Sequence, residues 1–342
     1  MDVKQLQPQY NDPLGVLAST AAVVRRSRHV RIDIGQLAVV AAKMARETVS
    51  PPGWDATLHF RDGTWRTAGW VLVLDALNFC FWNPGSAGSD PSDRWRVEYD
   101  GVAYNGYAAL AAALSRAVAE GRPLWDAAYL AGLDAAALRD ILRPVPGAPE
   151  IPLLAERLAN LREVGCGLRD GIGGPRPVET LIAAADGSAV RLIGDVVRRF
   201  PSFDDTACYG SEVVRFYKRA QILVADLAGA FDNDGLGAFA DLEHLTAFAD
   251  YKVPQVLREL GILVYDDHLA GLVDAHQLLP AGSPEEIEIR AGTVWAVELL
   301  RRALNDAGRR LRAFEIDGLL WTAGQTLALT ARPYHRTVTG YY

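Results

Sequence analysis

Cysteine is scarce in this sequence: its 342 residues include only three, Cys80, Cys166 and Cys208. An odd number of cysteines at such wide spacings matches neither a disulfide framework nor a zinc ligand set, so we expect reduced thiols without a chemical role. The six histidines are scattered and lack the paired spacing of metal ligands. We therefore predict that the protein holds no metal ion and no other cofactor.

Long apolar runs and an excess of positive charge are also missing. Charged residues interrupt every apolar stretch before it reaches the roughly 20 residues of a membrane-spanning helix, and the segment 1–6 is too polar for a signal peptide. The formal net charge is −7, whereas a protein that coats a nucleic-acid polymer needs a basic face. We expect a cytoplasmic protein with neither a membrane nor a nucleic-acid polymer as partner, although a few local cations would suffice for a single phosphate.

Familiar catalytic motifs are absent as well. The sequence contains no G-x-S-x-G nucleophile elbow, no glycine-rich phosphate loop of the Walker type and no H-E-x-x-H metal motif. The groups left for chemistry are carboxylates in apolar surroundings, so an enzyme built from this sequence would depend on Asp or Glu.

Helical periodicity dominates the chain, half of which is hydrophobic. We predict a mainly α-helical single domain over residues 1–342, with a small β-hairpin whose strands flank Asp100 and Gly101. The segment 65–82 is either a strand or a buried helix, and the glycine- and proline-rich region near 170–177 is either a loop or a boundary between two lobes. Helices are predicted at 14–26, 34–48, 107–120, 125–131, 134–142, 151–168, 178–199, 211–231, 242–249, 254–260 and 284–307, the last with Ser283 as its cap and Pro284 in its first position.

One predicted helix, 211–231, has apolar residues on nearly every side, so its polar residues should be at least partly buried. Arg219 and Asp226 are seven residues apart and share a stripe of this helix. A structural ion pair between them is one interpretation, and Asp226 as a reserve catalytic carboxylate is the other. Lys218 is either a solvated surface lysine or a partner for the phosphate of a ligand.

Asp250 is a carboxylate with aromatic neighbours. The segments 242–249 and 254–260 both have helical spacing, so Asp250 should lie in the connector between two short helices. An Asp at such a position often only caps the following helix. The alternative is catalytic: between Phe248 and Tyr251, Asp250 would face a nucleoside stacked on an aromatic ring.

A further carboxylate, Asp317, lies four residues before Trp321 and is followed by the tail 332–342. Terminal tails are often frayed, but this one is aromatic and basic without low complexity. We expect it to dock on the body of the protein, where His335 would supply contacts to phosphate or hydroxyl groups. A solvated tail without a role is the alternative.

Several segments, taken in order, carry a family resemblance. They are Leu77–Trp82, Tyr104–Tyr107, Phe200–Phe203 with Asp205, Tyr217–Asp226, Phe248–Gln255, Glu288–Arg290, Trp295–Glu298, Leu320–Trp321, Pro333–Arg336 and Tyr341–Tyr342. Each is weak alone, but together they span the chain, and in them the sequence resembles the queuosine 5′-phosphate N-glycosylase/hydrolase family (the queuosine salvage proteins). Thr322 stands where that family usually has Asp, which puts in doubt a role for this position but not for Asp317.

The resemblance implies a helical fold similar to helix-hairpin-helix DNA glycosylases and the release of queuine for re-use in tRNA modification. Breaking the ribosyl C1′–N bond builds positive charge on the sugar, so a carboxylate must lie near C1′. The leaving base is a 7-deazaguanine without N7, so the enzyme must rely more on electrostatic stabilisation.

We assign Asp250 as nucleophile or stabiliser, with Asp241 and Asp226 in reserve. Predicted substrate contacts are Phe248, Ala249, Tyr251 and Trp321 in the pocket, Asp317 on a polar group, Lys218 and His335 on the phosphate, and Asn78 and Phe79 as pocket walls.

Two other functions stay open at this point. The protein could be a helical carrier that binds queuine or its nucleotide without cleaving it. It could also be a glycosylase that acts on DNA or RNA polymer, an interpretation that the acidic net charge disfavours.

Overall fold

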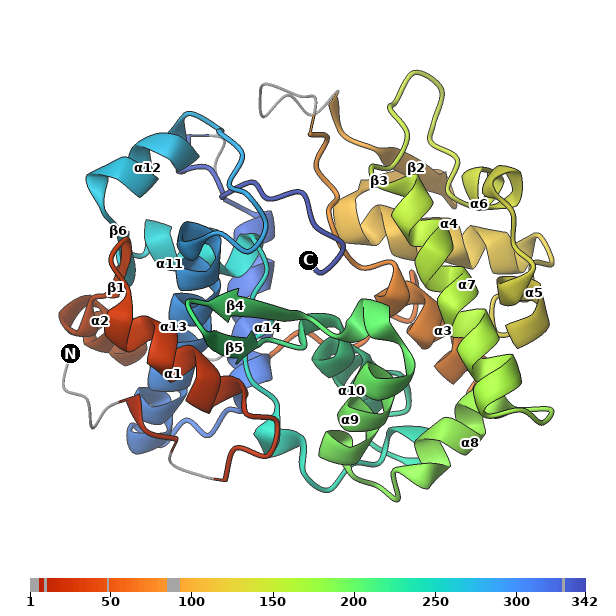
Figure 1. Ribbon diagram of the computed structural model, residues 1–342, viewed down its shortest axis with the longest axis horizontal. Helices are drawn as coiled ribbons and strands as arrows, with labels where there is room; N and C mark the ends of the chain where they lie inside the picture. Colours follow the sequence, from red (N-terminus) through yellow and green to blue (C-terminus); the bar gives the residue numbers. More distant parts are fainter. Residues whose placement is uncertain (1–5, 9–10, 48, 85–92, 328–329) are drawn as a thin grey trace. The chain divides into compact units, whose positions relative to one another are not determined.

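The structure is a computed structural model that describes all residues except 1–5, 9–10, 48, 85–92 and 328–329. Helix takes up 53% of it and strand 7%, which confirms the predicted mainly helical fold. None of the described helices is both long and apolar enough to cross a membrane. Figure 1 shows the elements in chain order.

The helices and strands have the following bounds. The helices are α1 (Val16–Arg26), α2 (Ile34–Met44), α3 (Trp65–Ala76), α4 (Gly106–Ala119), α5 (Ala127–Ala131), α6 (Ala135–Ile141), α7 (Leu154–Gly171), α8 (Pro177–Ala184), α9 (Ala189–Arg199), α10 (Lys218–Ala230), α11 (Lys252–Glu259), α12 (Asp267–Asp274), α13 (Pro284–Asp306) and α14 (Ala313–Gln325). The strands are β1 (Val30–Ile32), β2 (Arg96–Tyr99), β3 (Val102–Asn105), β4 (Thr206–Tyr209), β5 (Glu212–Arg215) and β6 (Leu263–Tyr265).

The chain folds into two compact units. Unit 1 comprises Met1–Pro52, Asp205–Gln221 and Asp241–Val338; unit 2 comprises Gly53–Asp204, Ile222–Ala240 and Thr339–Tyr342. The region 170–177, one of whose two interpretations is a lobe boundary, lies inside unit 2.

Helix α13 forms the centre of unit 1, where it contacts α1, α2, α11 and α14 (Figure 1). Ser283 caps its start by accepting the N–H of Glu286, and Pro284 takes the first helical position, as predicted. Trp295 and Leu300 are fully buried in the core of this unit. Because α13 is covered on nearly every side, it offers a rigid base for the segments that pack on it.

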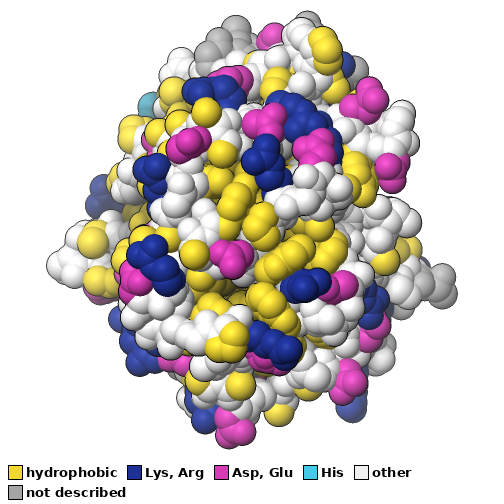
Figure 2. Space-filling model, turned by 90° about the vertical axis from the view of Figure 1, so that its right-hand side faces the viewer, with side chains coloured by type: hydrophobic (Ala, Val, Ile, Leu, Met, Phe, Trp, Pro, Cys, Tyr) yellow, Lys and Arg dark blue, Asp and Glu magenta, His cyan; other side chains and the backbone are white. Residues whose placement is uncertain are grey.

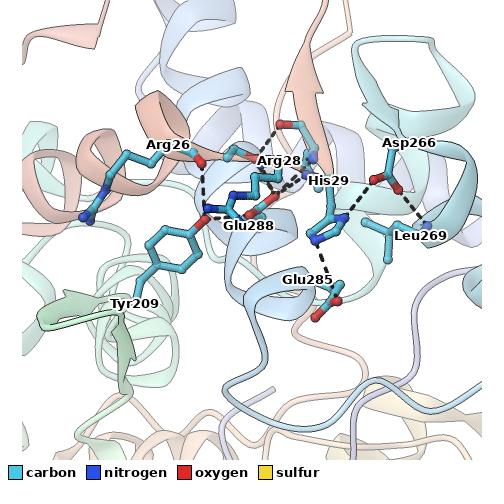
Figure 3. Close-up of polar contacts among 10 residues, drawn as sticks. Arg26, Arg28, His29, Tyr209, Asp266, Leu269, Glu285 and Glu288 are labelled. Atoms are coloured by element: carbon cyan, nitrogen blue, oxygen red, sulfur yellow. Dashed lines mark hydrogen bonds and ion pairs between the residues drawn. The ribbon is translucent and has the colours of Figure 1, made fainter.

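Glu288 on α13 holds neighbouring segments of unit 1 (Figure 3). Its Oε2 accepts the backbone N–H groups of Arg28 (3.0 Å) and His29 (2.7 Å), next to β1. Its Oε1 accepts the hydroxyl of Tyr209 (2.7 Å) at the end of β4. β1 pairs antiparallel with β6, and β4 pairs antiparallel with β5. A buried carboxylate therefore attaches both small sheets to the central helix.

Unit 2 is built around α3, whose Trp70 and Val73 are fully buried. This selects the helical alternative for 65–82, with the helix ending at Ala76. The predicted β2–β3 hairpin is present, and Asp100 and Gly101 both have positive φ in its two-residue turn. In the same unit α7 packs closely on α5, because a Cβ added to Gly165 would lie 2.3 Å from the backbone nitrogen of Ala131.

Some predicted helices were wrong. Residues 211–217 form strand β5 and a turn instead of a helix, with Val214 and Phe216 buried in a period-two pattern. The predicted helix 178–199 is two helices, because Asp186 and Gly187 adopt positive φ between α8 and α9. The sequence patterns also did not predict β1, β6, α12 or α14.

The segment 242–249 differs most from its prediction. It is a three-residue 3-10 turn, Leu242–His244, followed by an extended connector. The N–H of Thr246 donates to the side-chain oxygen of Gln221 (2.8 Å), and the N–H of Phe248 donates to Asp317 (2.9 Å). Distant side chains thus replace the hydrogen bonds that a helix would have made.

Candidate active site

Asp250 lies in unit 1 at the end of the extended connector, two residues before the start of α11 at Lys252. Its Oδ1 accepts the backbone N–H groups of Lys252 and Val253, both at 2.8 Å. Asp250 therefore does cap the helix, as one interpretation of the sequence held. Within the described part of the chain no hydrogen bond reaches its other oxygen, Oδ2. The cap fixes the orientation of the carboxylate while one oxygen is left for other chemistry.

Asp317 belongs to α14, which packs on α11 in unit 1. Its Oδ1 accepts the N–H of Phe248, two residues before Asp250, at 2.9 Å. The side chain of Asp317 is buried, and again no described residue donates a hydrogen bond to Oδ2. The connector and α11 thus fix two buried carboxylates, each by one oxygen.

The two carboxylates have different electrostatic surroundings. Burial raises the pKa of Asp250 overall, although the charge of Lys218 and the two backbone hydrogen bonds lower it in part. Burial and the charge of Asp250 together hold the pKa of Asp317 well above its usual range. Two neighbouring carboxylates do not readily ionise together, and the favourable partners gather on Asp250. Of the two, Asp250 therefore ionises first, and Asp317 keeps its proton to higher pH.

Lys218 lies at the start of α10 and is buried, so the structure excludes the solvated surface lysine. Its positive charge lowers the pKa of both Asp250 and Asp317. Its backbone N–H donates to Oδ2 of Asp205 (3.2 Å). The structure thus brings Lys218 to the carboxylates, and its contact with a phosphate stays a prediction.

Aromatic side chains surround the connector. The ring of Phe248 stacks on that of Phe314, with centroids 6.4 Å apart, and part of Phe248 is exposed between the buried Ala247 and Ala249. The ring of Tyr251 packs against Tyr334 with centroids 4.8 Å apart. Partly exposed rings next to a buried carboxylate suit a planar base.

Trp321 lies one helical turn after Asp317 on α14 and is half-buried. Residues four apart share a face of a helix, so Trp321 and Asp317 point to the same side of α14. Trp321 also packs against the hydrophobic core of unit 1.

The tail docks on the body of the protein, as expected: residues 332–338 belong to unit 1, and Thr339–Tyr342 belong to unit 2. Gln255 donates its side-chain N–H to the carbonyl of Arg332 (2.7 Å), and Leu279 donates its N–H to the carbonyl of Arg336 (2.8 Å). His335 is buried, and burial together with the charge of Arg290 lowers its pKa to about 3. The imidazole is therefore neutral at physiological pH and can offer hydrogen bonds but no positive charge.

Other predicted residues lie elsewhere. Asp241 is half-buried at the start of the 3-10 turn in unit 1. Asn78 and Phe79 belong to unit 2 and are buried, and the guanidinium of Arg157 lies 4.2 Å above the ring of Phe79. Asp226 lies on the part of α10 that belongs to unit 2. Their roles toward a substrate stay predictions.

A surface hollow of about 670 Å³ occurs in unit 2, and none of the predicted site residues lines it. Arg66, Arg176 and Glu179 are among its lining residues, and Arg176 lies 3.5 Å from Glu179 in a surface ion pair. Exposed ion pairs are solvated and carry little chemistry. The buried carboxylates of unit 1 are therefore the stronger candidates.

Sequence reasoning assigned no role to one buried ion pair next to the carboxylates. Arg290 on α13 and Asp205 form two hydrogen bonds, of 2.9 and 2.5 Å, and both side chains are nearly inaccessible to solvent. Both residues lie in segments that carried the family resemblance, but a charge in a sequence does not reveal its partner 85 positions away.

Comparison with known proteins identifies the family of the chain. A family model described as queuosine salvage protein matches residues 58–342. A protein of Sphaerobacter thermophilus, named queuosine 5′-phosphate N-glycosylase/hydrolase, is 51% identical over 97% of this chain and 98% of its own length. Proteins with the same name from Bos taurus and Schizosaccharomyces pombe are 34% and 32% identical, over 95% and 90% of this chain and 97% and 90% of their own lengths. The chain belongs to the queuosine salvage protein family.

Proposed function

We propose that this protein hydrolyses the N-glycosidic bond of queuosine 5′-phosphate and releases queuine for salvage into tRNA modification. Its relatives are named for this activity, and the matches cover almost their whole length. The structural observation that carries the proposal is the pair Asp250 and Asp317, each fixed through one oxygen while the other oxygen has no hydrogen bond among the described residues.

Asp250 is the catalytic carboxylate in this proposal. Departure of the base leaves positive charge on the ribose, and an anion close to C1′ stabilises that charge or activates the attacking water. Lys218 and the two backbone amides favour the ionised form of Asp250 despite its burial. Because the amides hold Oδ1, Oδ2 is the oxygen that would face the sugar.

Asp317 acts in this proposal as the acid that assists departure of the base. The base has a carbon where guanine has N7, so it must depart with help at another polar edge. A carboxyl group that keeps its proton at neutral pH can donate a hydrogen bond to that edge. The raised pKa of Asp317 supports this role. Phe248, which is partly exposed next to both acids, would stack on the base.

We assign the 5′-phosphate to Lys218 and His335. Lys218 would supply the positive charge, and His335, whose imidazole is neutral, would donate a hydrogen bond. Asn78, Phe79, Ala249, Tyr251 and Trp321 are kept as proposed pocket residues, and Asp241 and Asp226 as reserve carboxylates.

We further propose that residues 1–342 work as a single domain on the free nucleotide in the cytoplasm. The family match covers parts of both units. On the face drawn in Figure 2, basic and acidic side chains are interspersed, which suits a small substrate better than a nucleic-acid polymer. The likeness to helix-hairpin-helix glycosylases is also kept as a proposal, supported by the start of α11 two residues after Asp250.

The variant Asp250→Asn tests the proposal. Asn keeps an oxygen that accepts the N–H groups of Lys252 and Val253, so the fold should persist while the negative charge is lost. We expect turnover to fall by roughly three orders of magnitude or more, as for other essential catalytic groups. The assay is chromatography for free queuine after incubation with queuosine 5′-phosphate. The matched control is Asp267→Asn, an exposed carboxylate at the start of α12, which should keep wild-type turnover.

Three results would contradict the proposal in different ways. Near-normal turnover by Asp250→Asn would move the catalytic role to Asp241 or Asp226. Tight binding of the nucleotide by the wild-type protein without release of queuine would make the protein a carrier. Equal rates with queuosine and its 5′-phosphate would remove the phosphate role given to Lys218 and His335.

A further inference from the structure

We propose that the buried ion pair of Asp205 and Arg290 is the positioning element of the active site, which sets the Asp250 segment and the start of α10 at Lys218 in one fixed arrangement. The inference rests on the proposed function, because it concerns the same carboxylate. Neither residue is given a direct contact with substrate.

The hydrogen bonds of this pair reach both catalytic segments. Arg290 uses Nη1 and Nη2 for Asp205, and its Nε donates to the carbonyl of Ala249 at 3.1 Å. Ala249 directly precedes Asp250. On the other side, Oδ2 of Asp205 accepts the backbone N–H of Lys218 at 3.2 Å. The guanidinium of Arg290 and the carboxylate of Asp205 thus join the segment before Asp250 to Lys218, the first residue of α10.

The backbone of Asp205 reinforces the second of these contacts. Its carbonyl accepts the N–H groups of Phe216 (3.0 Å) and Tyr217 (3.1 Å). Tyr217 has a φ of 49°, a left-handed conformation that costs energy for a residue other than glycine. This strained residue turns the chain from β5 into α10. The main chain and side chain of Asp205 therefore both hold the turn that places Lys218.

An arginine at position 290 can contact Asp205 and the carbonyl of Ala249 at the same time, whereas a lysine could not. The planar fork of Arg290 makes two parallel bonds to the carboxylate while Nε is directed to a third acceptor. The guanidinium also lies 3.9 Å above the ring of Phe216, and Glu286 lies 3.6 Å away as a second carboxylate. A lysine ammonium would keep the charge but could not make all these contacts from one position.

Positioning matters here because Asp250 depends on Lys218 for its charge. The charged groups that act on Asp250 are Lys218 and Lys252, which lower its pKa, and its own charge raises the pKa of Asp317. If the pair is disrupted, Lys218 and Asp250 are no longer set relative to each other. The stabilisation of the Asp250 anion then weakens, and its pKa rises.

The variants Asp205→Asn and Arg290→Lys test this inference. We expect kcat for queuine release to fall about 10- to 100-fold, the effect of a displacement on the order of 1 Å. KM should rise by a smaller factor than kcat falls, because Lys218 and Ala249 are the only proposed substrate contacts that the change displaces directly. The acidic limb of the kcat profile should move to higher pH, since Asp250 must be ionised to act.

The matched control is Glu298→Gln. Glu298 is also buried on α13 and also pairs with arginines, Arg301 and Arg302, both at 2.7 Å. Its loss should lower the melting temperature while the kcat and pH profile of the folded protein stay unchanged. Kinetics are measured below the melting temperature of each variant and normalised to folded protein by circular dichroism.

The outcomes separate the inference from the proposed function. If the wild-type protein releases no queuine, the proposed function fails. If the wild-type protein is active and both pair variants fold with wild-type kcat and pH profile, the positioning role is refuted. Variants that do not fold at all would also refute it, because the pair would then serve the fold rather than the site.

Discussion

Replacing Asp317 by Asn should stabilise the protein at neutral pH although it impairs catalysis. Burial, together with the charge of Asp250, holds the pKa of Asp317 well above its usual value of 3.8. The folded protein therefore keeps a proton that the unfolded chain releases above about pH 4. Since the folded state binds more protons, the free energy of unfolding falls as pH rises, until folded Asp317 itself ionises.

The size of this effect is the slope of the free energy of unfolding against pH. One proton of difference changes the free energy of unfolding by about 1.4 kcal/mol per pH unit. Asn has the shape of the neutral acid, and its oxygen can still accept the N–H of Phe248, now at 2.9 Å from Asp317. The advantage of Asp317→Asn over the wild type should be small at pH 4. It should grow with that slope above pH 4 and level off at the folded pKa.

Urea unfolding followed by circular dichroism at pH 4, 5, 6 and 7 measures this difference directly. The exposed control Asp267→Asn should show no such rise. On the same Asp317→Asn protein, queuine release should fall by roughly 10²–10⁴, the usual share of a positioned general acid. A stability difference that stays constant between pH 4 and 7 would show that Asp317 is ionised in the folded state, and it would remove the acid role.

Two shorter predictions concern a surface ion pair and the stacking ring. Burial lowers the pKa of His29, but its hydrogen bond to Asp266 (2.8 Å) and the charges of Glu288 and Glu285 raise it overall above 6.5. Stability from this pair is present below pH 6.5 and lost as pH rises through the folded pKa, so His29→Gln should flatten the thermal stability profile there. If His29→Gln had the same dependence of thermal stability on pH as the wild type, the pair of His29 and Asp266 would not contribute to stability. Phe248→Ala should raise KM about 10-fold, the value of one stacking contact on a base, with kcat nearly constant; a wild-type KM would remove the stacking role.

Local signals predicted much of the fold correctly. The Ser283 cap with Pro284 predicted the start of α13, and the Asp100–Gly101 turn predicted the β2–β3 hairpin. Both depend on a few adjacent residues whose chemistry is local. The β4–β5 hairpin was missed because Val213 and Val214 suit a helix face as well as a strand, and a short apolar run does not decide between them.

The candidate site divides in the same way. Asp250, Asp317, Lys218 and Phe248 were predicted from residue type and family resemblance, and the structure brings them together in unit 1. The neutral state of His335 was not predictable, because it follows from burial and from the charge of Arg290. The roles of Asp205 and Arg290 escaped prediction for the same reason, since their bonds join residues far apart in the chain.

The connector that carries Asp250 shows why such a segment resists prediction. Gln221 accepts the N–H of Thr246, and Asp317 accepts that of Phe248. Arg290 donates to the carbonyl of Ala249. A helix satisfies its backbone locally, and its conformation can be inferred from periodicity. Here the backbone is satisfied by polar side chains from α10, α13 and α14, so its shape exists only once the tertiary structure has formed. Two of these side chains, Asp317 and Arg290, hold the segment that carries the proposed catalytic carboxylate, which links the irregular backbone to the proposed chemistry.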